Sequence, residues 1–512
     1  MRLQFIRAVG AALVLAGCQT AAPAPPTVAQ FGDSVQVEAG SLRGVRTEDG
    51  VVAFKGVPFA AAPVGDLRWR APQPVAAWDG VREAREFGPI CMQAPWPGVG
   101  RLYSGPTEPS EDCLFLNVWT QAQRADAKLP VMVWIYGGAF AAGSGSAPVY
   151  DGANLARRGV VVVTFNYRLG PLGFLAHPEL TAEAPYHASG NYGLLDQLAA
   201  LRWVKSNIAA FGGDPANVTL FGQSAGAFSV QALQASPLAA GLFHRAIGES
   251  GAMMNAGARD MGRDFRSAEA EGVGYARSLG ADSLAALRAL PAARFFEQRA
   301  MFRPVERDGY LLPDTVQATF EAGRQNRMPT LTGVNAKEET TFTVNWPAPR
   351  GADARRFGQF YTSTADPAAA NDTNLWRMWK WASLNSAGTG MKAYLYMFSH
   401  APPAPENAAR SGPVHGAEKA YVFDNLAAQY PGADAADERI ADLMADYWTN
   451  FAKTGDPNGE GLPPWPVLAA DDPRIMQFAD DARAEPLSRK DALTFLDGYF
   501  AQLRGAGAGA GR

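Results

Sequence analysis

The stretch F-G-G-D-P-A-N-V-T-L-F-G-Q-S-A-G at residues 211–226 decides the fold. Residues 218–221, V-T-L-F, predict a short buried strand. An alanine-rich helical pattern begins directly afterwards, at Ala225. Between strand and helix, Ser224 has small neighbours, as a serine needs when it sits on a sharp, strained turn. The stretch therefore predicts a strand, a tight turn carrying a nucleophilic serine, and a helix.

Other segments predict the sheet into which this strand fits. Residues 131–136 and 160–167 are apolar runs rich in β-branched and aromatic residues, and 393–398 is a further strand candidate. Leucine, valine and isoleucine recur at helical spacing over 194–208. Strands that alternate with helices indicate an α/β fold with a mostly parallel, doubly wound sheet and helices on both faces. Residues 255–385 are expected to be mainly helices and loops that form a cap.

The N-terminus has the character of an export signal. Two arginines precede the apolar residues 8–16, a run too short to span a bilayer, which takes about twenty helical residues. The run ends in L-A-G-C at 15–18, which resembles a bacterial lipobox with lipid attached to Cys18; an ordinary secretory signal is the alternative. The residue after Cys18 is Gln19, whereas an aspartate at that position would indicate retention in the inner membrane. The expected location is therefore the periplasmic side of the envelope, anchored to the outer membrane, and otherwise the periplasm or the exterior.

The length of 512 residues suggests about three domains at roughly 150 residues each, but it equally allows one large α/β domain. Residues 1–17 are predicted as the signal peptide, 18–34 as a flexible tether, 35–500 as a single domain and 501–512 as a disordered tail of alternating glycine and alanine. Hydrophobic residues make up 47% of the chain, enough for a large core. Lysine and arginine number 46 against 50 acids, so the chain has no basic footprint for nucleic acid.

A serine hydroxyl becomes a good nucleophile when a histidine accepts its proton. In proteins with this serine turn, an acid and then the histidine follow the serine along the chain. Of the five histidines in the chain, that order leaves His400 and His415. His400 ends a strand candidate, whereas His415 lies in the loop-like segment G-P-V-H-G. We therefore expect His415 to be the base.

The acid must lie between the serine and this histidine. Residues 328–334 predict a short strand, and N-A-K-E-E at 335–339 is the turn after it. An acid just past a strand end can reach the imidazole and fix its tautomer. The residues themselves leave Glu338 and Glu339 as equal candidates.

A glycine-rich turn follows the strand at 131–136 and is suited to stabilising an oxyanion. Backbone N–H groups must approach the reacting carbonyl closely, which small residues allow. The predicted donors are the N–H groups of Gly138 and Ala139, together with that of Ala225.

Several long motifs together resemble the type-B carboxylesterase/lipase family of α/β-hydrolases, which includes para-nitrobenzyl esterases and cholinesterases. The likeness runs from about Val37 to Asp497. Residues 211–226 look like the serine signature of the family, and E-D-C-L-F-L-N-V at 111–118 looks like its second signature. Further matching stretches lie at 54–65, 166–174 and 447–458.

The resemblance implies an α/β-hydrolase fold and carboxylesterase activity through an acyl-enzyme, with a small-molecule ester as substrate and neither metal nor cofactor. It selects Glu338, because the family places its acid five residues after a glycine, here Gly333; Glu339 replaces the glycine that usually follows. It also implies a disulfide between Cys91 and Cys113. Cys18 is then the odd cysteine.

Two alternatives accompany this interpretation. The same triad hydrolyses amides, thioesters and lactones as well as esters of short to medium acyl chains. A non-catalytic adhesion member, as in the neuroligin-like branch, is disfavoured because the chain keeps a complete set of nucleophile, base and acid. The G-G-A form of the oxyanion turn resembles members that accept bulky alcohols.

Overall fold

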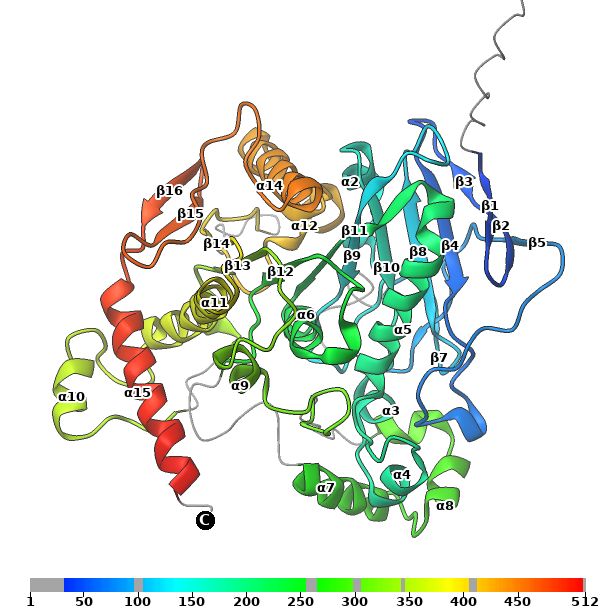
Figure 1. The fold of residues 1–512 in the computed structure, drawn as a ribbon, viewed down its shortest axis with the longest axis horizontal. Helices are drawn as coiled ribbons and strands as arrows, with labels where there is room; N and C mark the ends of the chain where they lie inside the picture. Colours follow the sequence, from blue (N-terminus) through cyan, green and yellow to red (C-terminus); the bar gives the residue numbers. More distant parts are fainter. Residues whose placement is uncertain are drawn as a thin grey trace, which may run out of the picture.

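The computed structural model describes residues 32–95, 105–254, 265–297, 305–341, 346–404 and 412–509. Its main element is an eleven-stranded sheet in the order β16-β15-β14-β13-β12-β11-β9-β10-β8-β4-β3 (Figure 1). The strands of this sheet are β3 Val45–Arg46, β4 Val52–Pro58, β8 Phe115–Thr120, β9 Leu129–Ile135, β10 Val161–Phe165, β11 Gly213–Gln223, β12 Arg245–Glu249, β13 Thr330–Asn335, β14 Ala393–Phe398, β15 Arg474–Phe478 and β16 Ala482–Pro486.

The middle of the sheet is parallel and its ends are antiparallel. The strands from β10 through β9, β11, β12, β13 and β14 to β15 pair in parallel. Antiparallel pairs close both ends, with β8, β4 and β3 at one and β16 at the other. Because parallel strands all end at the same edge, the turns after β9, β11, β12 and β13 come together there.

Helices fill the crossovers and flank the sheet. Their bounds are α2 Ala153–Arg157, α3 Gly170–Phe174, α4 Pro178–Glu183, α5 Tyr192–Asn207, α6 Ala225–Ala235, α7 Phe265–Ser278, α8 Leu284–Ala289, α9 Val316–Glu321, α10 Gly351–Phe357, α11 Pro367–Thr389, α12 Lys419–Val422, α13 Leu426–Gln429, α14 Ala435–Thr454 and α15 Lys490–Gly509. Two small sheets add β1 Ser34–Val37, β2 Gly40–Arg43 and β5 Val81–Glu83, and β6 Ile90–Cys91 with β7 Pro109–Ser110.

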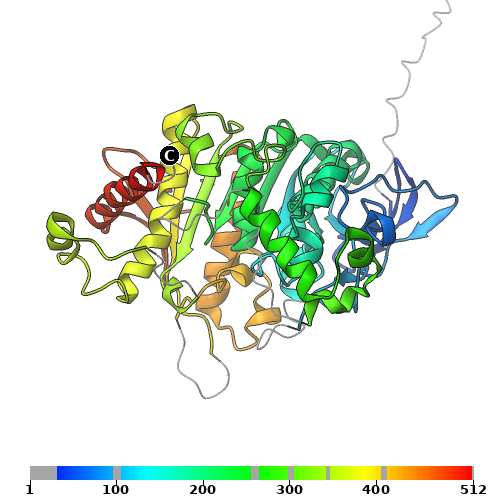
Figure 2. The same cartoon turned by 90° about the horizontal axis from the view of Figure 1, so that it is seen from below.

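Alternating residues of β12 show that helices cover both faces of the sheet. A Cβ on Gly248 would lie 2.1 Å from the ring of Trp381 in α11, which also donates a hydrogen bond to Gln234 of α6. The next residue, Glu249, accepts a hydrogen bond from Trp448 of α14 over 2.8 Å. Since successive strand residues point to opposite faces, α6 and α11 cover one face and α14 the other. Figure 1 shows α14 on one side of β12, β13 and β14 and α6 and α11 on the other, and Figure 2 gives the same ribbon from below. The predicted α/β architecture is confirmed.

The strands predicted from apolar runs are also found. Residues 131–136 and 160–167 correspond to β9 and β10, and β14 occupies 393–398 as predicted. Strand β11 begins earlier than expected, at Gly213, because an irregular stretch precedes the regular ladder at Val218. Most of 255–385 that the structure describes is helical or looped, yet β13 lies inside the sheet and α11 packs on it, so part of this segment belongs to the core layers.

The prediction of a disordered tail at 501–512 is wrong for most of its length. Helix α15 continues from Lys490 to Gly509. Phe500 is fully buried and packs on Trp376 of α11 with ring centroids 4.6 Å apart, so the helix is already anchored where the glycines begin. An established helix extends at low cost, and alanine has the highest helix propensity.

The signal peptide, Cys18 and nearly all of the tether lie outside the described residues. Strand β1 begins at Ser34, the last residue assigned to the tether. Within the described ranges, no helix combines the length and apolar character needed to cross a bilayer.

Candidate active site

Ser224 stands at the turn between β11 and α6. Its backbone has φ 56° and ψ −121°, a strained conformation for a residue with a side chain. Its N–H donates to the carbonyl of Glu249 over 2.8 Å, which ties the turn to the next strand. A Cβ on Gly226 would lie 1.9 Å from the carbonyl oxygen of Ile135, so only glycine permits this close approach. The strand, sharp turn and helix predicted around the serine are all present.

The turn after β9 lies directly against this serine. A Cβ on Gly137 would lie 3.0 Å from Cβ of Ser224. Gly138 and Ala139 follow with φ values of 115° and 55°. Their N–H groups donate no hydrogen bond to any residue that the structure describes. Ala225 is the first residue of α6, where N–H groups have no acceptor within the helix. Among the residues that the structure describes, none accepts from the N–H groups of these predicted donors, which can therefore serve a ligand oxygen.

Glu338 and His415 meet at the same edge of the sheet. Glu338 begins a short 3₁₀ helix, Glu338–Thr340, just after β13, and its side chain is fully buried. Its Oε2 lies 2.7 Å from Nδ1 of His415. A proton on Nδ1 is therefore held by the carboxylate, which leaves Nε2 to accept a proton. The structure thus brings the predicted acid and base together.

Hydrogen bonds join the acid-bearing turn to the histidine segment. The N–H of Lys337 donates to the carbonyl of Pro413 over 3.1 Å, and Lys337 and Val414 form an isolated parallel bridge. Asn335 donates its backbone N–H to Oε1 of Glu338 over 3.0 Å. Sequence reasoning did not select Asn335 as a residue of the site. Its place at the end of β13 is the signal that could have suggested it.

Gln223 is a second residue at this site that sequence reasoning did not select. Its side chain is almost wholly buried, and its Nε2 lies 3.2 Å from Nε2 of His415. A Cβ on Gly137 would lie 2.9 Å from its Oε1, so the carboxamide lies between the oxyanion turn and the histidine. In the hydrogen bonds among described residues, Nε2 of His415 contacts this amide and not the hydroxyl of Ser224. Such catalytic contacts are often loose without substrate and tighten in the reacting complex.

Buried charged groups lie behind the Glu338–His415 pair. Burial raises the pKa of Glu249 well above its ordinary value, and the charge of Glu418 raises it further. Burial, followed by the charge of Glu338, raises the pKa of Glu418 as well. Burial lowers the pKa of Lys419 to about 8, against the attraction of the two carboxylates. Three carboxyl groups and one amine therefore share a low-dielectric region, where each proton affects its neighbours.

The rejected candidates have other partners. His400 contacts Asp437 rather than Glu338, with 2.7 Å between Nε2 and Oδ1. The carboxylate that contacts His415 is that of Glu338. Its neighbour Glu339 donates its backbone N–H to the side chain of Asn371. The structure thus favours Glu338 on geometry where sequence alone left the pair open.

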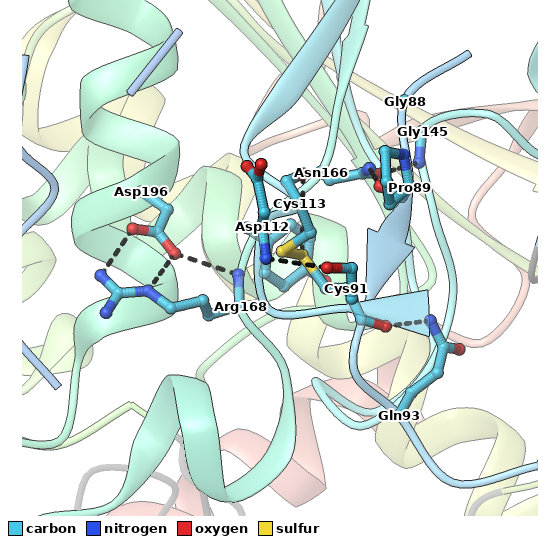
Figure 3. Close-up of a disulfide and its surroundings, with 12 residues drawn as sticks. Gly88, Pro89, Cys91, Gln93, Asp112, Cys113, Gly145, Asn166, Arg168 and Asp196 are labelled. Carbon is cyan, nitrogen blue, oxygen red and sulfur yellow. Dashed lines mark hydrogen bonds and ion pairs between the residues drawn. A yellow bond between two sulfur atoms is a disulfide. The ribbon is translucent and has the colours of Figure 1, made fainter. Parts of the chain in front are cut away.

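The implied disulfide is present, with Cys91 bonded to Cys113 (Figure 3). A small, partly open pocket lies beside it, lined by Trp69, Leu172 and the disulfide itself among others. Ser224, Glu338 and His415 do not line this pocket. Figure 3 shows Arg168 of the neighbouring loop directed away from the disulfide toward Asp196, with which it forms a buried ion pair at 2.7 Å.

Comparison with known proteins finds a family and relatives that match most of the chain. Residues 32–388 and 368–496 match the model of the carboxylesterase family. A fumonisin B1 esterase of Sphingopyxis macrogoltabida is 39% identical over 489 residues, which cover 87% of this chain and 87% of that protein. A para-nitrobenzyl esterase of Bacillus subtilis (strain 168) is 34% identical over 467 residues, covering 85% of this chain and 92% of that protein.

Solved structures give the same picture. A PNB esterase has a TM-score of 0.78 at 32% identity, covering 91% of this chain and 99% of that chain. A carboxylesterase of Geobacillus stearothermophilus has a TM-score of 0.77 at 35% identity, covering 91% of this chain and all 100% of that chain.

The parallel sheet, the serine turn after β11 and the acid–histidine pair at the same edge define an α/β-hydrolase. The sequence matches then place it within that class. The chain belongs to the carboxylesterase family, and it is a carboxylic ester hydrolase whose substrate is a small-molecule ester.

Proposed function

We propose that Ser224, His415 and Glu338 hydrolyse carboxylic esters through an acyl-enzyme. The observation that carries this assignment is the 2.7 Å contact between Glu338 and His415, formed across 77 residues of sequence at the edge where the strained Ser224 turn lies. With Nδ1 protonated and held by Glu338, Nε2 of His415 accepts the proton of Ser224 as its oxygen attacks the ester carbonyl. The protonated histidine then gives that proton to the leaving alcohol.

The developing oxyanion binds the N–H groups of Gly138, Ala139 and Ala225 in this proposal. All three belong to turns that pack against each other, and the first residue of α6 adds the positive end of a helix dipole. Water then attacks the acyl-enzyme, with His415 as general base, and releases the acid. The similarity to a fumonisin B1 esterase and a para-nitrobenzyl esterase supports esters as the substrate class. Short to medium acyl chains are proposed.

The substitution Ser224→Ala tests the assignment. We expect it to lower kcat for p-nitrophenyl acetate by roughly 10⁴-fold or more, because no other group replaces the nucleophile. It should also abolish labelling by a fluorophosphonate probe. Within a series of p-nitrophenyl esters from acetate to palmitate, the wild type should prefer the shorter chains.

Ser250 offers a matched control. It also follows a parallel strand, with φ 52° and a buried side chain, but it lies after β12. Ser250→Ala should keep both hydrolysis and probe labelling. Hydrolysis by Ser224→Ala at the wild-type rate would exclude the proposed nucleophile.

We also propose that the protein is an exported lipoprotein whose mature chain begins at Cys18. The apolar segment at 8–16, the L-A-G-C sequence and the proline-containing stretch after it support this proposal. The Cys91–Cys113 disulfide is consistent with an oxidising compartment outside the cytoplasm. Gln19 favours the outer membrane, and the lipid would then be the membrane contact.

A further inference from the structure

Asn335 links the two segments that carry the acid and the histidine. It is the last residue of β13, and only 1% of its surface is exposed. Its Nδ2 donates to the carbonyl oxygen of Val414 over 2.7 Å and to Oε2 of Glu418 over 2.5 Å. These two acceptors stand on either side of His415 in the sequence. One carboxamide therefore holds both ends of the short segment that presents the histidine.

The orientation of this carboxamide is fixed by its partners. A backbone carbonyl and a carboxylate are both acceptors, so the nitrogen and not the oxygen must face them. The backbone N–H of the same residue donates to Oε1 of Glu338. Asn335 thus donates to the acid, to the residue before the histidine and to a second carboxylate three residues after it.

An amide suits this position better than an acid or an apolar side chain. Glu338 and Glu418 are both fully buried; the side-chain amide of Asn335 donates to Glu418, and its backbone N–H donates to Glu338. Burial and the charge of Glu338 raise the pKa of Glu418, while the hydrogen bond from Asn335 opposes that rise. An aspartate would add a third carboxylate, and an alanine would leave the carbonyl of Val414 without this donor.

We propose that Asn335 is a positioning residue that sets His415 on Glu338 at the distance and angle the reaction needs. This inference rests on the proposed function, because it assigns to Asn335 a role that acts through the proposed base. Asn335 touches neither the serine nor the oxyanion turn in the described contacts. Its loss should therefore affect proton transfer rather than substrate binding.

The test compares Asn335→Ala with Asn326→Ala in the full-length protein. Asn326 is the control, because its partly buried Nδ2 also donates to backbone carbonyls, those of Leu233, Gln234 and Ser236, but near the opposite end of β13. With p-nitrophenyl acetate, we expect Asn335→Ala to lower kcat by about 10- to 100-fold, since small misplacements of catalytic groups cost that much. KM should change by less than about threefold, because binding groups are untouched.

The control should lower the midpoint of thermal unfolding by a comparable amount and keep kcat near the wild-type value. Asn335→Asp is the second variant: it preserves the shape of the side chain, removes both donations from Nδ2 and keeps the backbone donation to Glu338. It tests the proposal if the alanine variant fails to fold. It should also lose kcat and label more slowly with a fluorophosphonate. Wild-type kcat in a folded Asn335 variant, or equal loss of kcat in Asn326→Ala, would overturn the proposal. Full activity of Ser224→Ala would instead overturn the proposed function, so the two failures are distinguishable.

Discussion

Gln223 places an uncharged amide against the nitrogen of His415 that receives the serine proton in the proposed mechanism. The amide nitrogen is 3.2 Å from Nε2, and a neutral imidazole with its proton on Nδ1 can accept a hydrogen bond there. When Nε2 becomes protonated, that hydrogen bond is lost and the amide must turn or move. Gln223 thus contacts the atom that receives the serine proton in the proposed mechanism, and this contact must be released at each proton transfer.

Replacing this amide by a carboxylate should change the pH dependence of hydrolysis. In Gln223→Glu, a negative charge beside Nε2 would stabilise the imidazolium, so the base would be lost at a higher pH. The acid limb of the kcat/KM profile should move up by about one pH unit or more. Gln223→Leu, which removes the hydrogen bond without adding charge, should move that limb by clearly less than Gln223→Glu does. Profiles measured from pH 5 to 9 that coincide for the glutamate variant and the wild type would contradict this role.

The chemistry of single residues could be predicted from sequence only where order along the chain constrains it. Ser224 is marked by its small neighbours, and His415 by following both serine and acid. Gln223 and Asn335 carry no such mark, because their partners lie 192 and 83 residues away. Their roles depend on which face of the sheet each side chain leaves from, and strand register fixes that only after folding.

At the scale of elements, four paired residues near the ends of neighbouring strands form a row across the sheet. Gln223 of β11 pairs in register with Glu249 of β12, which pairs with Gly333 of β13, which pairs with Tyr396 of β14. Paired residues point to the same face. A Cβ on Gly333 would lie 2.1 Å from the Tyr396 ring, so the glycine gives the tyrosine room to lie across the row.

This row makes stability depend on pH through Glu249. Burial and the charge of Glu418 raise its pKa well above the ordinary 4.5, so the folded protein keeps a proton that the unfolded chain releases. The group's contribution to stability is thus complete below pH 4.5 and is lost as pH rises toward the folded-state pKa. Glu249→Gln is neutral throughout and still accepts from Trp448. The free energy of unfolding of Glu249→Gln minus that of the wild type should therefore increase from pH 5 to 8, by up to about 1.4 kcal/mol per pH unit.

Thermal unfolding of both proteins across that range measures the difference. Glu83→Gln is the control, since Glu83 is half exposed in a surface ion pair with Arg43, and its difference from wild type should stay flat. A difference for Glu249→Gln that is constant with pH would show that Glu249 is ionised in the folded protein.

Sequence predicted the elements whose burial is continuous and missed those whose form depends on neighbours. The apolar runs of β9, β10 and β14 are buried throughout or nearly so, and their strands follow from composition. Strand β15 mixes arginine and glutamine with apolar residues, and its place at the sheet margin comes from pairing with β14 and β16. The glycine- and alanine-rich end of α15 was predicted to be disordered from its own composition. It is helical because it continues a helix that begins at Lys490.

For the whole molecule, the proposed lipid anchor predicts a chemical difference at the N-terminus. Expressed with its own signal in a Gram-negative host, the mature protein should start at Cys18, carry acyl groups by mass measurement and fractionate with the outer membrane. Cys18→Ser should abolish acylation and membrane association while leaving specific activity unchanged, because β1 begins only at Ser34. A wild-type protein recovered without acyl groups would instead favour the ordinary secretory signal.

The contacts between the turn that carries Glu338 and the segment that carries His415 also affect how the chain folds to an active enzyme. Glu338 and His415 are separated by 77 residues and Asn335 and Glu418 by 83, so both contacts close long loops. Contacts of that kind form late, after local helices and adjacent strands have paid the entropy of ordering. During refolding, recovery of esterase activity should therefore lag behind recovery of the helical circular dichroism signal. A chain that is already compact can still lack the Glu338–His415 contact that proton transfer needs.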